Sequence, residues 1–496
     1  MAWFSRRTKA AETESRHQSV EDWPLLHLPT GDVWTARDSF SGSLVTGATG
    51  AGKTSGPGQN LALAMLEAGW GGLVLTAKTD EAAIWRDYAK CAGREDELIV
   101  IDDTAIHRFN FMHHAVTVAP TPHILTLNLV GLYGSIMEAI NGTAEVLEDY
   151  WTHARDQLLT NAFDAILPAY GTVDLQIVDK LILSAPTSVD QLHDETWQNE
   201  SACMETLKRA FDNIRQDDPI RRRSLDQSAA YFLNEYPKLP DRTRSSIVST
   251  FRSASDLLNR GLLWKLFATD TTYVPEVCRN GAIIILDLPV HTHQKAGIIA
   301  QVLFKYVWQQ AMQRPSGGEE RPVFLWCDEY HHFAVQADAT FQSTARAYRI
   351  ATVYMFQNLP ILHAALGGQQ AEPYVNAILG NLATRFFTAN AEPQTNHWAS
   401  ETIGHTIQRL HSASSSTNRQ EESLTNWLIT GEDTASFTSQ SGYSEQMLPQ
   451  VQPQVFTRLR TGGPANNCEV DAIMFQTGRT FRNGRTFVTV AFPQNI

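Results

Sequence analysis

The stretch Gly47-Ala48-Thr49-Gly50-Ala51-Gly52-Lys53-Thr54 decides the fold of this chain, because it fits the pattern G-x-x-x-x-G-K-[ST]. Residues 43–46 before it are typical of a short buried strand, and the apolar run 60–66 after it is typical of a helix. In this setting glycines let backbone N–H groups turn toward phosphate oxygens, Lys53 reaches the terminal phosphates and Thr54 offers a hydroxyl to Mg²⁺. The stretch therefore predicts a site for a nucleoside triphosphate. A glycine-rich turn without nucleotide is the alternative.

The composition is that of a globular protein with more than one domain. The chain has 496 residues, of which 43% are hydrophobic and 19% are charged, and this length suggests two or three domains. No run of about eighteen apolar residues predicts a membrane helix, and the first residues lack the apolar segment of a signal peptide, so we expect a cytoplasmic protein. The net charge of −13 means that local basic clusters would have to hold any nucleic acid.

Strand-like and helical segments alternate along most of the chain. This alternation predicts an α/β fold with a mainly parallel central sheet covered by helices. We expect residues 1–35 to form an N-terminal arm, and residues 36–169 and 246–496 to form one nucleotide-binding domain. The apolar runs that predict its first strands lie at residues 73–75, 98–101, 282–286 and 322–327.

A helix-rich interval interrupts the nucleotide-binding domain. Residues 143–260 contain a single glycine and show helical periodicity, so we expect residues 170–245 to form an inserted all-α domain. Closer to the C-terminus, a serine-rich tract and the polar sequence after it predict a flexible loop over residues 411–446. Two later apolar runs, 469–475 and 486–492, predict strands that close the domain.

A second apolar strand ends in two acids, in the sequence Phe324-Leu325-Trp326-Cys327-Asp328-Glu329. Nucleotide hydrolases hold Mg²⁺ with an acid in this position. We predict that Asp328, together with Thr54, binds the metal, and that Glu329 is the general base for the attacking water. A pair of acids that merely caps a helix is the alternative.

Polar residues around the strand at 350–356 are further candidates for the site. Gln357 follows this strand and is placed to touch the γ-phosphate or its water, with a simple turn residue as the alternative. Arg346 and Arg349 before the strand, and Arg385 in a later strand, are candidates for an arginine finger that reaches a neighbouring subunit. Arg346 is preferred among them, and a plain surface charge is the alternative for each.

The order of these motifs resembles a known family, the coupling-protein ATPases of conjugation and type IV secretion, of TraG/TraD type. They belong to the FtsK/HerA superfamily of hexameric DNA-pumping motors. The resemblance covers roughly residues 30–495, and this sequence is similar to members without a transmembrane anchor. The motifs that carry it are, in order, GATGAGKTS at 47–55, LVLTAKTD at 73–80, RFNFM at 108–112, the helix from Asp149, AIIILDLP at 282–289, VFLWCDEYHHF at 323–333, ARAYRIATVYMFQN at 345–358 and GNLATRFF at 380–387.

The resemblance implies a RecA-like P-loop motor domain with ATP and Mg²⁺ as cofactors. Metal binding would fall to Thr54 and Asp328, and catalysis to Glu329 as the base, Gln357 as the γ-phosphate sensor and Arg346 as the finger. The ATP-binding residues would be Gly47, Ala48, Thr49, Gly50, Ala51, Gly52, Lys53, Thr54 and Ser55.

Two segments depart from the family's motifs. The segment of Arg346 lacks both glycines of the family's G-R-x-x-G-I pattern, which weakens the finger assignment. Lys78 and Asp80 lie in a segment that resembles the D-x-K-G-E motif, with Thr76 in place of its first acid.

The sequence thus predicts an ATP-hydrolysing motor of coupling-protein type that recruits or pumps DNA, single- or double-stranded, as a homo-hexamer. Relaxase and secretion-channel or membrane adaptor proteins are the expected partners, which could recruit the chain from the cytoplasm to the inner face of the membrane. Arg221-Arg222-Arg223 and Arg242-Thr243-Arg244 are candidate DNA contacts, or else solvated helix faces. A translocase of a mobile element or defence system, and an ATP-gated docking protein for protein cargo, are the alternatives.

Overall fold

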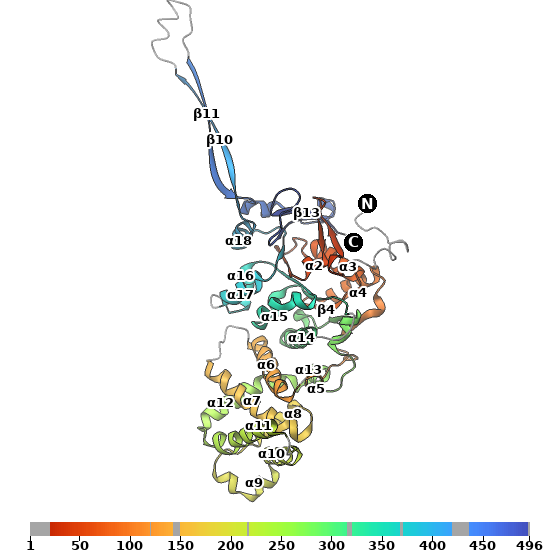
Figure 1. Ribbon diagram of the computed structural model, residues 1–496, viewed down its shortest axis with the longest axis vertical. Coiled ribbons are helices and arrows are strands. Elements are labelled where there is room, and N and C mark those ends of the chain that lie inside the picture. Colours follow the sequence, from red (N-terminus) through yellow and green to blue (C-terminus); the bar gives the residue numbers. More distant parts are fainter. Residues whose placement is uncertain are drawn as a thin grey trace, which may run out of the picture.

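A nine-stranded sheet forms the centre of the protein in the computed structural model, which describes residues 20–119, 121–141, 149–215, 218–314, 320–367, 371–418 and 436–494 (Figure 1). The strand order is β13-β12-β9-β3-β8-β7-β4-β6-β5. Strands from β9 to β5 are parallel to their neighbours, and β12 and β13 add an antiparallel edge, as predicted for a mainly parallel sheet. The strands are β3 (Ser43–Thr46), β4 (Gly71–Leu75), β5 (Leu98–Ile101), β6 (Ile283–Leu286), β7 (Val323–Cys327), β8 (Ile350–Phe356), β9 (Thr384–Phe387), β12 (Glu469–Gln476) and β13 (Phe487–Pro493).

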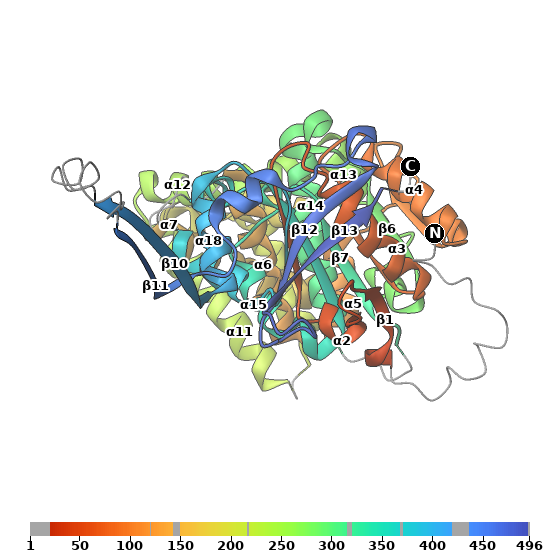
Figure 2. The ribbon, with the colours of Figure 1, turned by 90° about the horizontal axis from the view of Figure 1, so that it is seen from above.

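Each central strand is buried on both faces, because successive side chains of a strand point in opposite directions. In β7, Phe324 and Trp326 belong to one hydrophobic core, whereas Leu325 belongs to the other. Helices α3 (Gln59–Glu67) and α4 (Glu81–Cys91) cover the first face. The second face is covered by α14 (Val290–Met312), α15 (Ala337–Ala345), α16 (Leu359–Ala365) and α17 (Glu372–Gly380). Figure 2 shows α3 and α4 on one side of the strands and α6 and α15 on the other.

The N-terminal segment packs into the sheet domain as a short hairpin. Strands β1 (Pro24–His27) and β2 (Val33–Thr35) pair antiparallel, and α2 (Ala36–Ser39) follows. Trp34 is fully buried, and its indole N–H donates to the hydroxyl of Thr384 in β9 at 3.2 Å. Part of the predicted arm, residues 1–19, lies outside the described residues.

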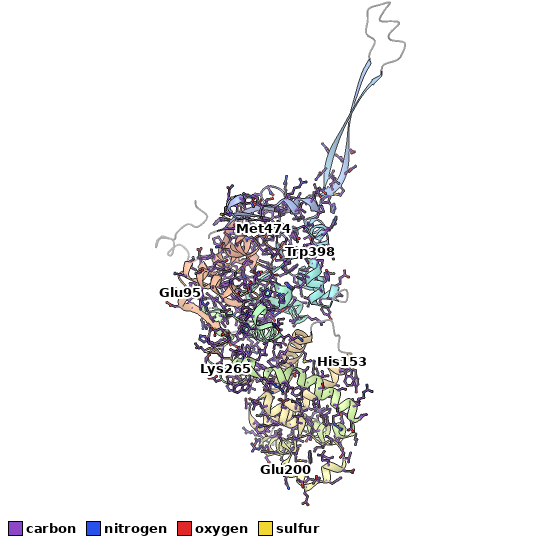
Figure 3. The ribbon with its side chains drawn as sticks, turned by 180° about the vertical axis from the view of Figure 1, so that it is seen from behind. Glu95, His153, Glu200, Lys265, Trp398 and Met474 are labelled. Carbon is purple, nitrogen blue, oxygen red and sulfur yellow. The ribbon has the colours of Figure 1, made fainter. Side chains whose placement is uncertain are left out.

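A layer of helices lies beyond α14, at one end of the molecule. Figure 3 marks its extent, with Glu200 at the far end and Trp398 on the sheet domain. Its core is continuous with the core under α14. Its helices are α5 (Phe111–Val118), α6 (Pro122–Asn141), α7 (Asp149–Tyr170), α8 (Leu175–Leu183), α9 (Glu195–Glu200), α10 (Ala202–Asn213), α11 (Pro219–Ala230), α12 (Asp241–Leu258) and α13 (Gly261–Phe267).

The predicted limits of the all-α domain, residues 170 and 245, are wrong in detail. Helix α7 ends at Tyr170 and packs against α10, α11 and α12, so it belongs with the helices that follow it. The second limit falls inside α12, which is one continuous helix from Asp241 to Leu258. A limit cannot divide a helix whose buried face, including Ile247 and Phe251, packs into one core.

The predicted loop over residues 411–446 is also corrected, because the structure places most of it in two long strands. Strand β10 (His405–Asn418) pairs antiparallel with β11 (Ser436–Pro449) over its whole length, in register from His405 opposite Pro449 to Asn418 opposite Ser436. This ribbon projects away from the rest of the protein (Figure 1) and joins neither of the other sheets. None of the ribbon side chains whose burial is described, those of residues 405–409 and 444–449, is buried, so no core imposes an apolar alternation on these positions. Residues 419–435 lie outside the described part of the chain.

A buried ion pair fixes the segment after β7 against α14. The amine of Lys305 lies 2.5 Å from Oδ2 of Asp338, and both side chains are fully buried. The same carboxylate accepts the Tyr330 hydroxyl at 2.8 Å and the Gln309 amide at 2.9 Å. Lys305 also donates to the backbone oxygen of Phe333 at 2.6 Å. Lys305 and Gln309 belong to α14, so these contacts anchor on that helix the chain that directly follows Asp328 and Glu329.

Removing the carboxylate of Asp338 should destabilise the fold. The Asp338→Ala variant leaves the Lys305 ammonium buried without a counter-ion, so we expect a loss of about 3–5 kcal/mol in the free energy of unfolding. Chemical denaturation would measure this loss. Asp190→Ala, at an exposed position of the helical layer, is the control and should cost less than about 0.5 kcal/mol. Equal stability of the two variants would contradict the role of the pair.

Candidate nucleotide-binding site

The glycine-rich loop leaves β3 and turns directly into a helix. Residues 54–58 form a π-helical turn that continues into α3, so the backbone N–H groups at its start face the loop. The Lys53 amine folds back over the loop and donates to the backbone oxygens of Gly47 at 2.8 Å and Ala48 at 3.2 Å. Burial lowers the pKa of Lys53, while Glu329 and Asp328 raise it again, in part. The loop therefore holds a buried cation where phosphate would approach.

Two glycines are required by the conformation of this loop. Gly50 and Gly52 have φ values of +76° and +77°, a region that other residues rarely adopt. A Cβ atom on Gly52 would also lie 2.4 Å from the Val470 side chain of β12, whereas one on Gly50 would meet nothing within 4 Å. Strand β12 of the antiparallel edge therefore packs directly against the loop.

The chain after β9 supports the loop on its other side. The backbone N–H of Ala48 donates to the oxygen of Ala389 at 2.8 Å, and the Thr388 hydroxyl donates to Thr46 at 3.0 Å. From the C-terminus, Gln494 donates to the Ser55 hydroxyl at 2.6 Å. Sequence reasoning missed these supports, because no local motif marks them. They come from segments more than 330 residues away.

The sheet brings the predicted metal ligands together. The hydroxyl of Thr54 donates to Oδ2 of Asp328 at 2.7 Å, although the two residues are 274 positions apart. Strand β8 lies between β3 and β7, so the carboxyl ends of all three strands meet at one edge of the sheet. A hydroxyl beside a buried carboxylate is the oxygen set that Mg²⁺ prefers. The residues present therefore fit the metal that the sequence predicts.

Glu329 has a special backbone conformation beside this pair. Its φ and ψ are 50° and 49°, in the left-handed region, where a residue other than glycine carries strain. The Oε2 atom is buried, has no hydrogen-bond partner among the described residues and lies 3.7 Å from Nδ1 of His331. Burial alone would raise the pKa of Glu329, but the charges of Lys78 and Lys53 outweigh it and hold this pKa below its ordinary value. The result is an ionised carboxylate with one oxygen unused, as a general base requires.

Lys78 binds all the carboxylates of the site. Its amine lies 3.3 Å from Oε1 of Glu329, 3.5 Å from Oδ2 of Asp328 and 3.7 Å from Oε1 of Glu81. Burial lowers the pKa of Lys78, yet the three carboxylates together raise it well above its ordinary value. Asp80, which the sequence placed in the family's motif, is exposed. The buried acid is its neighbour Glu81, which accepts the N–H of Ala77 at 2.6 Å.

The remaining predicted residues lie at different places on the sheet. Gln357 follows Phe356, the register partner of Thr46, and is half-buried beside the loop. Its backbone oxygen accepts the Asn390 amide at 3.1 Å. Arg346 is exposed and precedes β8, so it lies about 23 Å from the loop, given seven strand residues at 3.3 Å each. It cannot act on the nucleotide of its own subunit.

Arg385 is not available as a finger. Its side chain lies in β9 and donates to the backbone oxygen of Leu379 at 2.8 Å, with its guanidinium 5.1 Å from the ring centre of Trp398. Burial lowers the pKa of Arg385 to about 10. A side chain held in this way supports the sheet and cannot reach a neighbouring subunit.

Comparisons with known proteins agree with this geometry. The family model for type IV secretory system conjugative DNA transfer matches residues 5–428. The chain belongs to this family. No curated protein has a statistically significant match to this chain. In the described residues, no helix is both long and apolar enough to cross a membrane.

Solved structures of the plasmid coupling protein TrwB have a similar fold. Its complex with ADP and Mg²⁺ is 13% identical with a TM-score of 0.58, covering 98% of this chain and 92% of that one. The complex with the ATP analogue ADPNP is 14% identical with a TM-score of 0.56, covering 98% and 93%. The predicted family and the predicted RecA-like α/β fold are both confirmed.

Gly52 offers a test of the loop geometry, with Gly50 as its matched control. Both substitutions to alanine incur the cost of a positive φ, roughly 1–2 kcal/mol. Only Gly52→Ala adds a contact at 2.4 Å with Val470, so it should lose roughly 1–3 kcal/mol more in the free energy of unfolding. Val470 is fully buried, so its own truncation costs stability. Adding Gly52→Ala to a Val470→Ala variant should therefore cost less in urea denaturation than adding it to the parent. Equal losses for the two single variants would contradict the packing of β12 on the loop.

Glu81 predicts a pH dependence of stability. Burial, and then the charge of Asp328, raise the pKa of Glu81 from 4.5 to about 8, so between these values the folded protein keeps a proton that the unfolded chain has lost. This contribution to stability is present at low pH and is lost as the pH rises toward 8. Glu81→Gln removes it, so stability should fall less between pH 5 and pH 8 in the variant than in the parent. Urea midpoints at both pH values would measure the difference.

The pH dependence of the Glu81→Gln variant must be compared with that of the parent, because His331 also changes the stability with pH. Burial lowers the pKa of His331 to about 4, which makes stability rise with pH, but it does so in parent and variant alike. Identical pH dependence in the two proteins would show that Glu81 is ionised in the folded state.

Proposed function

We propose that this chain is an ATP-hydrolysing motor that moves or recruits DNA in conjugation or type IV secretion. The observation that carries the proposal is the contact between Thr54 and Asp328 at 2.7 Å, with the unpaired Oε2 of Glu329 beside it. A site for nucleotide binding alone would not need a buried, ionised acid with a free oxygen. The structures of TrwB with ADPNP and with ADP and Mg²⁺ support ATP and Mg²⁺ as the cofactors.

Each residue of the site then has a distinct task. The backbone N–H groups of residues 47–55 would bind the phosphates, and Lys53 would exchange its backbone acceptors for phosphate oxygens. Thr54 and Asp328 would hold Mg²⁺, which neutralises phosphate charge when bound. Glu329 would orient the attacking water and accept its proton, and Gln357 would contact the γ-phosphate from β8. Lys78 would keep the acids together while the metal is absent.

We further propose that the motor works as a ring, in which one subunit completes the site of the next. Arg346 supports this arrangement, because it is exposed and precedes the amino end of β8, whereas the loop of its own subunit lies at the carboxyl ends of the strands. As an arginine finger it would act on a neighbour's nucleotide. A homo-hexamer is the form implied by the family resemblance, and a relaxase or a channel protein would be its partner in transfer.

Both proposed DNA contacts lie in the helical layer, on α11 and α12. Arg221, Arg222 and Arg223 are exposed on α11, and Arg222 also stacks over Phe211 at 4.6 Å. Arg244 is buried, pairs with Asp241 and donates to the backbone oxygen of Leu239, so it is unavailable for DNA. The arginines of α11 are therefore the better candidates for salt-sensitive phosphate contacts.

Turnover of ATP by the Glu329→Gln variant tests this proposal. The amide cannot accept a proton, so we expect kcat to fall by roughly 10²- to 10⁴-fold while ATP binding persists. Lys53→Ala should lose binding and turnover together, and Glu200→Gln, far out on the helical layer, should match the parent. Phosphate release with and without DNA at low salt would measure these rates, and the parent should be stimulated severalfold by DNA. Unchanged turnover in Glu329→Gln would exclude it as the base, and no response to DNA would exclude the DNA-handling part.

A further inference from the structure

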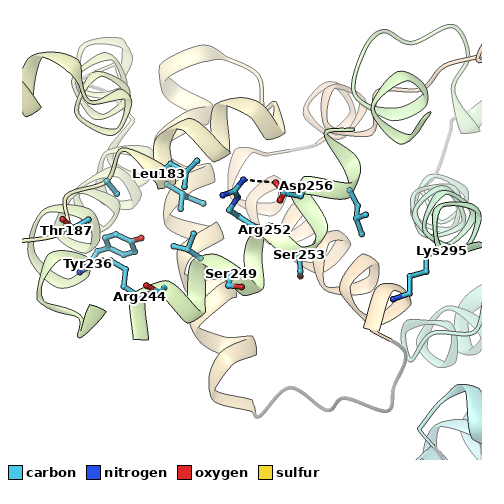
Figure 4. A pocket seen from close by; sticks show the side chains of 14 residues that line it. Leu183, Thr187, Tyr236, Arg244, Ser249, Arg252, Ser253, Asp256 and Lys295 are labelled. Atoms are coloured by element: carbon cyan, nitrogen blue, oxygen red, sulfur yellow. Dashed lines mark hydrogen bonds and ion pairs between the residues drawn. The ribbon is translucent and has the colours of Figure 1, made fainter. Parts of the chain in front are cut away.

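A groove of about 860 Å³ lies between α8, α12 and the start of α14, away from the nucleotide site (Figure 4). It follows α12 from Arg244 to Leu257, a length of about 20 Å at 1.5 Å per residue. The groove therefore has the length of three to four helical turns. Nothing in the proposed ATPase cycle uses it.

The groove has apolar walls that are partly open to solvent. Ile182 and Leu183 contribute from α8, and Val248 and Leu257 from α12. Leu183 is 57% exposed and Leu257 is 39% exposed, which is unusual for leucines that share one concave surface. Apolar side chains gathered in this way mark an interaction site more often than a free surface.

Three small hydroxyl residues contribute to the α12 side of the groove. Ser245, Ser249 and Ser253 follow one another at intervals of four residues, so they share one face of the helix. Ser253 donates to the backbone oxygen of Thr250 at 2.8 Å, so its hydroxyl stays close to its own helix. A row of small side chains leaves a trough into which another helix can pack closely.

Three basic residues, Arg244, Arg252 and Lys295, line the groove together with one acid, Asp256. Arg244 is already paired with Asp241, which is not a lining residue. Arg252 is held by Asp256 at 3.1 Å, whereas Lys295 is exposed and forms no ion pair within the described part of the chain. On a chain with a net charge of −13, Lys295 therefore leaves one positive charge at the groove. Such a groove is complementary to carboxylates on a ligand.

We propose that this groove docks an amphipathic helix of a protein partner, with apolar side chains on one face and carboxylates beside them. Leucine-type anchors at i, i+3, i+4 and i+7 would lie on the apolar walls, and the carboxylates would meet Lys295 and Arg252. DNA fits the groove less well, because nucleic-acid interfaces are more polar and more strongly positive than these walls. The proposal is independent of ATP hydrolysis, since no residue of the groove belongs to the nucleotide site.

Binding of a synthetic peptide to the full chain tests the proposal. The probe is a fluorescent helix of about 18 residues with leucines at the spacing above and flanking glutamates, and its control carries lysines in place of the glutamates. Fluorescence anisotropy should show that the glutamate peptide binds at least about fivefold more tightly than the lysine peptide. Equal binding of the two peptides would overturn the proposal.

Three variants locate the binding site. Leu183→Asp and Lys295→Glu should each weaken the glutamate peptide at least about fivefold. Ile220→Asp, at a 59% exposed position of α11 outside the groove, should not. Unchanged peptide binding in both groove variants would overturn the proposal. The proposal would also fail if Lys295→Glu weakened the binding of a fluorescent oligothymidylate and left peptide binding unaffected. A basal ATP turnover equal to that of the parent shows that each groove variant is folded. The Glu329→Gln variant should lose ATP turnover and still bind the peptide as the parent does.

Discussion

The carboxyl ends of the neighbouring strands β3, β8 and β7 lie side by side, and the rest of the site depends on this constraint. It places the Thr54 hydroxyl 2.7 Å from Asp328 across 274 residues of chain. Parallel pairing of these strands, with β8 between the other two, fixes the distance between the loop and the acids. A shift of one residue in β7 would turn Asp328 to the opposite face of the sheet and remove it from the loop.

The charges of the site are balanced before any ligand arrives. Lys53 is held by backbone oxygens, and Lys78 lies within ion-pair distance of Asp328 and Glu329. The charges of Lys78 and Lys53 keep the pKa of Glu329 below its ordinary value, so this acid stays ionised. The buried pair of Lys305 and Asp338 then fixes the chain that follows the acids. Both arrangements keep Asp328 and Glu329 in place without relying on a metal, which is the physical meaning of a preorganised site.

The nucleotide site and the groove lie in different parts of the molecule. The β10–β11 ribbon and the helical layer lie at opposite ends, with the sheet and its nucleotide site between them (Figure 1). The groove of the helical layer is therefore remote from the loop, and α14 connects the two regions because it lines the sheet and contributes Lys295 to the groove. A partner bound in the groove would contact the motor without covering its nucleotide.

The sequence by itself determined the loop, the acids after β7, the parallel sheet and the presence of a helical insertion, because each depends on local patterns of glycine, charge and apolar spacing. Tertiary structure alone decided that Glu81 and not Asp80 faces the site, that Arg385 is buried, and that Thr388 and Gln494 support the loop. It also decided that residues 405–418 and 436–449 pair as a ribbon. These outcomes depend on contacts between segments far apart in the chain, and packing, not local preference, selects which side chain is buried in them.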